Sequence, residues 1–161
     1  MKKFMKEIGS YLIIIVVVLL IKQFAFTLVK VNGTSMEKTL YNGNIMILNR
    51  LDTKFAREDI VVIDKSVEGN LIIKRIIGLP GEKIACEEGI IYINDTEYED
   101  KYAYGMTSNF EEITLKNDEY FVLGDNRLVS LDSRYFGPVN KKAILGSSKF
   151  IVFPFNKFGN V

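Results

Sequence analysis

Val31-Asn32-Gly33-Thr34-Ser35-Met36-Glu37-Lys38-Thr39-Leu40 is the stretch around which the chain is organised, since an apolar segment precedes it and strand-like segments follow it. Its chemical centre is Ser35. A serine hydroxyl is a poor nucleophile at neutral pH, so an attack by Ser35 on a carbonyl carbon needs a base that takes its proton. The chain contains no histidine, which excludes Ser-His-Asp and Cys-His arrangements and leaves a carboxylate or a lysine as the base.

A candidate base is Lys74, which lies in the stretch Asn70-Leu71-Ile72-Ile73-Lys74-Arg75-Ile76-Ile77-Gly78. Strand alternation puts Ile72 and Ile76 on the same face as Lys74. Burial among these side chains would lower the pKa of Lys74, so that its amine could be neutral near pH 7 and act as a base. Two alternatives stay open: Lys74 on a solvated edge with its ammonium in water, and Ser35 as a turn or helix-cap serine.

A third stretch is a dense polar cluster between hydrophobic strands: Gly124-Asp125-Asn126-Arg127-Leu128-Val129-Ser130-Leu131-Asp132-Ser133-Arg134-Tyr135-Phe136-Gly137. The three stretches together resemble the blocks G-x-S-M-x-P-T-L, K-R-x-x-G-x-P-G-[DE] and G-D-N-R-x-x-S-x-D-S-R-x-x-G of bacterial type I signal peptidases. These enzymes are serine proteases with a Ser-Lys dyad. A calcium loop is the competing interpretation of the third stretch, but its two arginines and the spacing of its carboxylates argue against one.

The resemblance implies a role for each matched position. Ser35 would be the nucleophile, and Lys74 would be the general base that later protonates the leaving amine. Ser130 would hydrogen-bond the lysine and orient it. Five further residues would be structural and would hold the third stretch against the dyad by pairing among themselves: Arg75, Asp125, Arg127, Asp132 and Arg134. The resemblance implies no cofactor and no metal.

The tetrahedral oxyanion of such a reaction needs hydrogen-bond donors, and the Ser35 backbone N–H in the turn at Gly33 is available. Some family members carry a serine at the position of Gly33, so here a backbone group or water must supply the second donor. The resemblance implies that the partners are secretory precursors with small residues one and three positions before the cut, bound as an added strand. Candidate contacts with substrate or the lipid surface are Val31, Met36 and Leu40.

One position departs from the family pattern, because Lys38 stands where the first block has proline. Loss of the fixed φ would loosen the loop behind Ser35, and a cation near a membrane would alter which substrates dock. This leaves open a protein dedicated to a narrow client, such as a pilin or surface-assembly precursor, or an assembly chaperone. A chaperone would be expected to lose Ser35 or Lys74. Self-cleaving repressor-type proteases also use a Ser-Lys dyad, but they are soluble.

The first thirty residues predict a membrane anchor. The chain is apolar from Tyr11 to Ile21 and again from Phe24 to Val29. A helix from Ile8 to Val29 would be about 33 Å long, enough to span a bilayer once, whereas a buried globular helix is the alternative. Three lysines within the first six residues bias that end to the cytoplasm, which places Ser35 outside the cell membrane and near its outer leaflet.

Composition agrees with one domain after the anchor. The net charge of +1 gives no case for nucleic acid, and the single cysteine, Cys86, allows no internal disulfide and is expected to be a packing residue. We therefore predict an anchor over 1–30 and, over 31–161, a mostly β extracytoplasmic catalytic domain of β-barrel or β-sheet type with one Greek-key-like or barrel-like core. By resemblance, 83–118 is a small variable insertion. Strands are predicted at 45–48, 59–63, 71–77, 89–93, 119–123 and 150–153.

Overall fold

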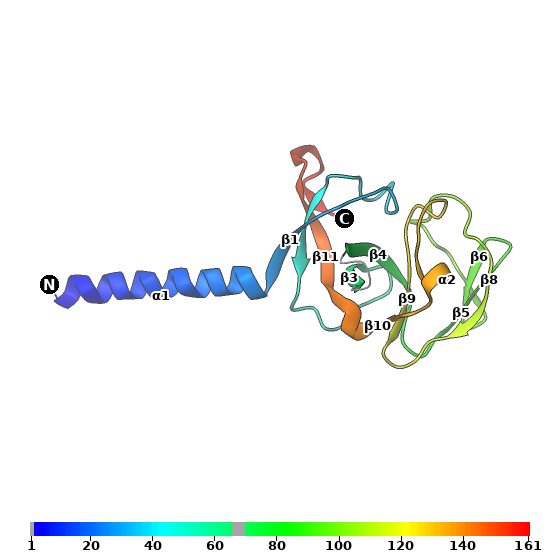
Figure 1. Cartoon of the computed structure of the whole chain (residues 1–161), viewed down its shortest axis with the longest axis horizontal. Coiled ribbons are helices and arrows are strands. Elements are labelled where there is room, and N and C mark those ends of the chain that lie inside the picture. The colour runs from blue at the N-terminus through cyan, green and yellow to red at the C-terminus, as the bar shows by residue number, and fades with distance from the viewer. Residues whose placement is uncertain (1, 66–69) are drawn as a thin grey trace.

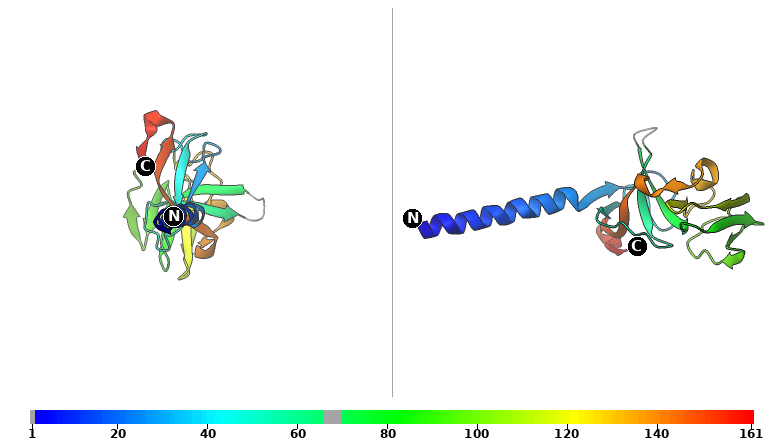
Figure 2. Two further views of the ribbon diagram at one scale, coloured as in Figure 1. Left: turned by 90° about the vertical axis from the view of Figure 1, so that its left-hand side faces the viewer. Right: turned by 90° about the horizontal axis from the view of Figure 1, so that it is seen from below.

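A long helix stands apart from a body built of strands (Figures 1 and 2). The structure is a computed structural model that describes residues 2–65 and 70–161, without the side chains at 2–6, 21–24, 65 and 70. The lysine side chains that predict the orientation of the N-terminus therefore lie outside the described residues. Helix α1 spans Lys2–Phe24, and its apolar side chains at position 8 and from 11 to 20 are 43–68% exposed. Within the part of the chain whose side chains the structure describes, which leaves out both ends of α1, no helix is both long enough and apolar enough to cross a membrane.

The larger of two sheets has eight strands in the order β1-β2-β11-β3-β4-β9-β10, with β12 paired to β11. Its strands are β1 (Phe26–Lys30), β2 (Ile45–Asn49), β3 (Ile60–Lys65), β4 (Asn70–Gly78), β9 (Glu119–Leu123), β10 (Val139–Asn140), β11 (Ile144–Phe153) and β12 (Gly159–Asn160). All of their pairings are antiparallel. Strand β4 lies between β3 and β9, so Lys74 belongs to an interior strand of the sheet.

The smaller sheet has four strands in the order β7-β6-β5-β8. Its strands are β5 (Lys83–Glu87), β6 (Ile90–Ile93), β7 (Thr96–Tyr98) and β8 (Phe110–Thr114). The remaining elements are short helices: α2 (Ser133–Phe136), η1 (Lys141–Ala143) and η2 (Phe155–Lys157). Figure 1 shows this second sheet at the end of the body that lies farthest from α1.

Buried apolar side chains form three clusters, of which the first holds the stretch around Ser35. In this cluster Val31, Met36 and Leu40 pack with side chains of β1, β2 and β3. The second cluster lies around β3 and β9, and the third lies between β9 and the smaller sheet. Cys86 is buried in the third cluster, where burial raises the pKa of its thiol, as expected of a packing residue. The loop that carries Ser35 is therefore fixed to the larger sheet by its own apolar residues.

The prediction of a mostly β domain is confirmed, and all six predicted strands are present. The strands form two sheets with separate clusters, not the single barrel-like core that we expected. The predicted helix to Val29 is wrong, because α1 ends at Phe24 and residues 26–30 pair with β2 as β1. The predicted strands omit β1, β5, β7, β8, β10, β12 and the first half of β11.

Candidate active site

The loop from Gly33 to Leu40 presents Ser35 at the surface of the body. Gly33 has φ +91°, which L side chains rarely adopt, and its N–H donates to Asn42 Oδ1 over 3.0 Å. The Glu37 N–H then donates to the Thr34 carbonyl over 3.2 Å. Ser35 itself stays half-buried between the buried residues of this loop.

Val31, Met36 and Leu40 were predicted to contact substrate or the lipid surface; the lipid contact is wrong, and the substrate contact stays a prediction. These side chains are only 3%, 1% and 0% exposed, because they fill the cluster beneath the loop. A bilayer cannot reach atoms buried this deeply. These three apolar residues stand close to Ser35 in the sequence because their side chains pack the Ser35 loop onto the larger sheet.

Lys74 reaches Ser35 from β4. Its Nζ lies 2.8 Å from the Ser35 Oγ, within hydrogen-bonding distance, and the side chain is 4% exposed. Lys74 pairs with Val61 of β3, whose side chain is fully buried. The alternative of a solvated edge lysine is therefore excluded, because β4 is an interior strand and Lys74 is buried.

The third stretch lies directly against the Ser35 loop. The Asn126 N–H donates to the Ser35 carbonyl over 3.0 Å. Gly124 makes this approach possible, because a Cβ there would lie 2.5 Å from the Ser35 carbonyl oxygen and 2.1 Å from Ser130 Oγ. Only glycine fits so close to both groups.

Ser130 is buried beside the loop but does not make the predicted contact with the lysine. Its Oγ has no hydrogen-bond partner among the described residues. In this structure Ser130 therefore does not orient Lys74 through a direct hydrogen bond, and its role in orienting the lysine stays a prediction.

A buried ion pair connects the lysine strand with the serine loop. The Arg75 Nε and Nη2 atoms lie 2.8 Å and 2.7 Å from the two carboxylate oxygens of Asp125, and the residues are 2% and 0% exposed. Asp125 also accepts a hydrogen bond from the Thr39 hydroxyl, four residues after Ser35. Because Arg75 follows Lys74 directly, this one pair joins the segments that carry Lys74 and Ser35.

The other predicted pairing is correct for Asp132 and wrong for Arg127. The Arg134 Nε lies 2.8 Å from an oxygen of Asp132, whose other oxygen accepts from the Gly124 N–H over 3.0 Å. Arg127 instead pairs with Asp100, and its Nη1 donates to Thr107 over 2.6 Å. The ion-pair partner of Arg127 therefore comes from the segment 83–118, while its Nε donates to the Gly124 carbonyl of the third stretch over 2.8 Å.

Sequence reasoning missed several residues of this segment. The Tyr102 ring covers the Arg75 guanidinium, with 3.6 Å between the guanidinium carbon and the ring centroid. The Lys38 ammonium lies 4.3 Å from the centroid of Tyr104, whose N–H donates to the Asp125 carbonyl over 2.7 Å. The only signal for these contacts is the number of tyrosines in the segment, which does not identify their partners.

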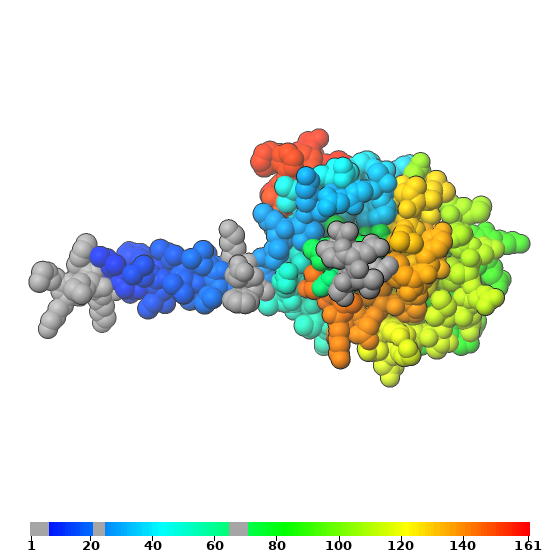
Figure 3. Space-filling view, viewed as in Figure 1, coloured from blue at the N-terminus to red at the C-terminus, as the bar shows by residue number. Residues whose placement is uncertain are grey.

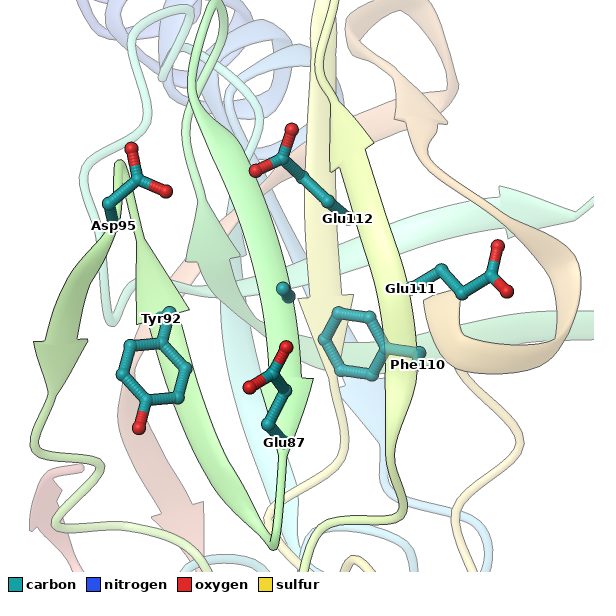
Figure 4. Close-up of a pocket in the computed structure, with 7 residues that line it drawn as sticks. Glu87, Tyr92, Asp95, Phe110, Glu111 and Glu112 are labelled. Carbon is teal, nitrogen blue, oxygen red and sulfur yellow. The ribbon is translucent and has the colours of Figure 1, made fainter.

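Two cavities lie outside this arrangement of Ser35 and Lys74. One of about 240 Å³ lies on the smaller sheet, where the Tyr92 and Phe110 rings stand among the carboxylates of Glu87, Asp95 and Glu112 (Figure 4). The other, of about 300 Å³, is lined by residues that include Arg75 and Tyr102. Neither is lined by Ser35 or Lys74.

Comparison of the chain with known proteins identifies its family. The family model described as signal peptidase, peptidase S26, matches residues 2–153. Signal peptidase I of Bacillus licheniformis is 36% identical over 93% of this chain and 89% of the relative. Signal peptidase I of Streptococcus pneumoniae serotype 4 is 30% identical over 98% of this chain and 97% of the relative.

A solved structure agrees with these sequence matches. The crystal structure of a signal peptidase I from Enterococcus faecalis V583 superposes with a TM-score of 0.53 at 33% identity, covering 58% of this chain and 96% of that chain. The chain therefore belongs to the signal peptidase I family of serine peptidases, peptidase S26, which remove signal peptides from secretory precursors.

Proposed function

We propose that Ser35 is the nucleophile and Lys74 the general base of this peptidase. The observation that carries the proposal is the 2.8 Å distance between Lys74 Nζ and Ser35 Oγ, with the lysine buried. The chain contains no histidine that could take the place of the lysine. Burial disfavours the ammonium form, so Lys74 is expected to be neutral often enough to accept a proton.

The proposed reaction uses one proton twice. As Ser35 Oγ bonds to the scissile carbonyl carbon, its proton passes to Lys74 Nζ and the carbonyl oxygen becomes an oxyanion. The Lys74 ammonium then protonates the leaving amine as the peptide bond breaks, which leaves an ester on Ser35. Lys74 next takes a proton from water as the water oxygen attacks the ester. The Lys74 ammonium then returns this proton to Ser35 Oγ as the ester bond breaks, and the new carboxylic acid loses its own proton to solvent.

We propose that the precursor binds as an extended strand next to the segment that leads to Ser35. Strand β1 ends five residues before Ser35 and is the last strand in the order of its sheet, so one edge is left for an added strand. Small residues one and three positions before the cut would then lie on the same face of the sheet.

We further propose that α1 anchors the enzyme in the cell membrane with its N-terminus in the cytoplasm. In support, α1 stands clear of the body (Figure 3) and its apolar side chains at 11–20 have no protein cover. At ~1.5 Å per residue its 23 residues are about 35 Å long, comparable with a bilayer core. Exposed apolar residues in and directly after β1 and η2, which lie toward α1, would contact the outer leaflet: Leu28, Phe155 and Phe158.

This topology predicts a protease-accessible domain. Protease added outside intact spheroplasts is expected to digest the chain from Val31 to Val161 and to spare the first residues, as read by antibodies to each end. Lipid should raise the cleavage rate of full precursors more than that of short soluble peptides. A β domain that stayed protected until the cells were lysed would contradict the proposed orientation.

The pH dependence of the rate is expected to follow Lys74. Acidification protonates the lysine and removes the base, so kcat/KM should rise with pH through an apparent pKa below the ~10.4 of free lysine. The rate is measured on one precursor from about pH 5 to about pH 11, with circular dichroism at each pH to separate loss of base from unfolding. A rate that began to rise only above about pH 10 would contradict a buried, partly neutral lysine.

The function is tested directly with the detergent-solubilised full chain. Incubation with a secretory precursor should give one cut after a small residue, identified by mass spectrometry, and Ser35→Ala should give none. Cleavage of a panel of precursors that includes a pilin-type precursor distinguishes an enzyme of general substrate range from one dedicated to a single kind of precursor. Binding of precursors without any cut by the wild-type chain would favour the assembly chaperone.

A further inference from the structure

We infer that Asn126 is a positioning residue for the oxyanion donor. Its side-chain amide holds the Thr34 carbonyl, and this orients the Ser35 N–H toward the place where the tetrahedral oxygen forms. The inference rests on the proposed role of Ser35 as nucleophile, and it adds a residue to which the family resemblance assigns no role here.

Asn126 makes two hydrogen bonds to successive carbonyls of the Ser35 loop. Its backbone N–H donates to the Ser35 carbonyl over 3.0 Å, and its Nδ2 donates to the Thr34 carbonyl over 3.3 Å. The residue is 6% exposed, so water does not compete strongly for these bonds. The Thr34 carbonyl also accepts from the Glu37 N–H over 3.2 Å, so this buried side chain and the turn of the loop together fix the peptide group that precedes the nucleophile.

The orientation of that peptide group decides where the Ser35 N–H points. In a trans peptide the C=O and the N–H point in opposite directions. Because the Thr34 carbonyl points at Asn126, the Ser35 N–H points away from Asn126. None of the hydrogen bonds among the described residues uses this N–H, which leaves it available to an oxyanion.

The orientation of the Asn126 amide follows from its surroundings. With Nδ2 toward Thr34, the Oδ1 atom is buried and has no hydrogen-bond partner among the described residues. The reversed amide would bring Oδ1 against the Thr34 carbonyl oxygen, and two acceptors repel each other. The contact with Thr34 therefore requires a donor at this position, even though the other end of the amide stays unsatisfied.

Asn126 can hold the loop because its own backbone is fixed. Its carbonyl accepts from the Ser130 N–H over 3.1 Å, and it forms a parallel bridge with Tyr104. The preceding Asp125 carries the buried ion pair with Arg75. The side-chain amide therefore projects from a rigid support.

Loss of this amide should lower kcat and leave KM unchanged, because the oxyanion exists only in the transition state and the intermediate. Removing a whole oxyanion donor lowers kcat by about 10²- to 10³-fold. Misorienting a donor is milder, so for Asn126→Ala we expect a loss of about 10- to 100-fold. Asn126→Asp, assayed at alkaline pH where its carboxyl is ionised, keeps the shape without the donor and should lose at least as much.

The test compares cleavage with binding of a peptide aldehyde. Ser35 Oγ adds to the aldehyde carbon, the carbonyl π bond breaks and the hydroxyl proton passes to Lys74, so the aldehyde oxygen occupies the oxyanion position. Asn126→Ala and Asn126→Asp should weaken aldehyde binding by about the same factor as kcat. In the Ser35→Ala background, Asn126→Ala should leave the Kd of an uncleaved precursor peptide unchanged. The remote Asn140→Ala, which removes exposed hydrogen bonds to Asp118 and to the Lys142 N–H, is the matched control and should leave kcat unchanged.

The outcomes separate this inference from the proposed function. Unchanged aldehyde affinity in a folded Asn126 variant, or a rise in KM that accounts for the lost activity, would overturn the positioning role alone. Should Asn126→Ala fail to fold by circular dichroism, Asn126→Asp decides the question. If the wild-type chain formed no adduct between Ser35 and the aldehyde, the proposed nucleophile would be wrong instead.

Discussion

Replacing Lys74 by arginine or methionine is expected to reduce kcat on a secretory precursor by at least about 10³-fold while the domain stays folded, since both nucleophile activation and leaving-group protonation need this amine. Arginine keeps the positive charge but cannot lose a proton at any accessible pH. Lys74→Arg therefore distinguishes two roles of Lys74: a base that takes a proton, and a positive charge that only stabilises the oxyanion. The measurement is a single-turnover cleavage assay, with circular dichroism on each variant.

The matched control is Lys83→Met on β5, which removes an exposed lysine from a surface pair with Glu112. Its cleavage rate should equal that of the wild-type chain. If Lys74→Arg kept a tenth or more of the wild-type rate, Lys74 would act through its charge and the proposed base would be wrong.

Asp125→Ala is expected to lower the free energy of unfolding by about 3–5 kcal/mol, which is the range for removing one partner of a buried ion pair. The substitution leaves the Arg75 guanidinium buried without its carboxylate, and it also removes the acceptor of the Thr39 hydroxyl. Urea titration followed by circular dichroism measures the change, with the slope checked for two-state behaviour.

Glu112→Gln, at the exposed pair with Lys83, serves as the control and should change stability far less. The double change Arg75→Met with Asp125→Leu removes both charges and should regain part of the lost stability, because no buried charge is then left unpaired. An Asp125→Ala chain as stable as the wild type would show that the pair does not hold the two segments together.

The sequence was sufficient to find Ser35, Lys74 and the strands with continuous apolar runs. The strands are local features that apolar runs and turn residues reveal, whereas Ser35 and Lys74 each left a structural alternative open and were found through the resemblance of all three stretches to one family. Strands β5 and β8 were harder to predict, because β5 buries only Ile84 and Cys86, β8 buries no residue fully, and both carry charged residues. The residues 26–30 are apolar enough to continue α1, and only pairing with β2 makes them a strand.

The partners within the site could not be predicted in the same way. Arg127 was expected to pair inside its own stretch, whereas Asp100, 27 residues earlier, meets it through the fold. The prediction of lipid contacts was wrong for a related reason. An apolar residue beside an exposed nucleophile looks the same in the sequence whether its side chain faces a membrane or the protein core. Three-dimensional packing decides between these outcomes, and a short stretch of sequence does not contain that information.

The junction between α1 and β1 determines how freely the catalytic domain can move. Only Ala25 separates the two elements, its side chain is buried, and its carbonyl accepts from the Arg50 N–H over 2.8 Å. A junction this short, and hydrogen-bonded to Arg50 at its carbonyl, limits the change in angle between α1 and β1, so we expect a tilt of the helix to tilt the domain with it. With α1 as the proposed anchor, Ser35 would stay at a nearly constant height above the bilayer. A precursor would then have to bring its cut site to that height, and the number of residues between its own membrane segment and the cut would be limited by geometry.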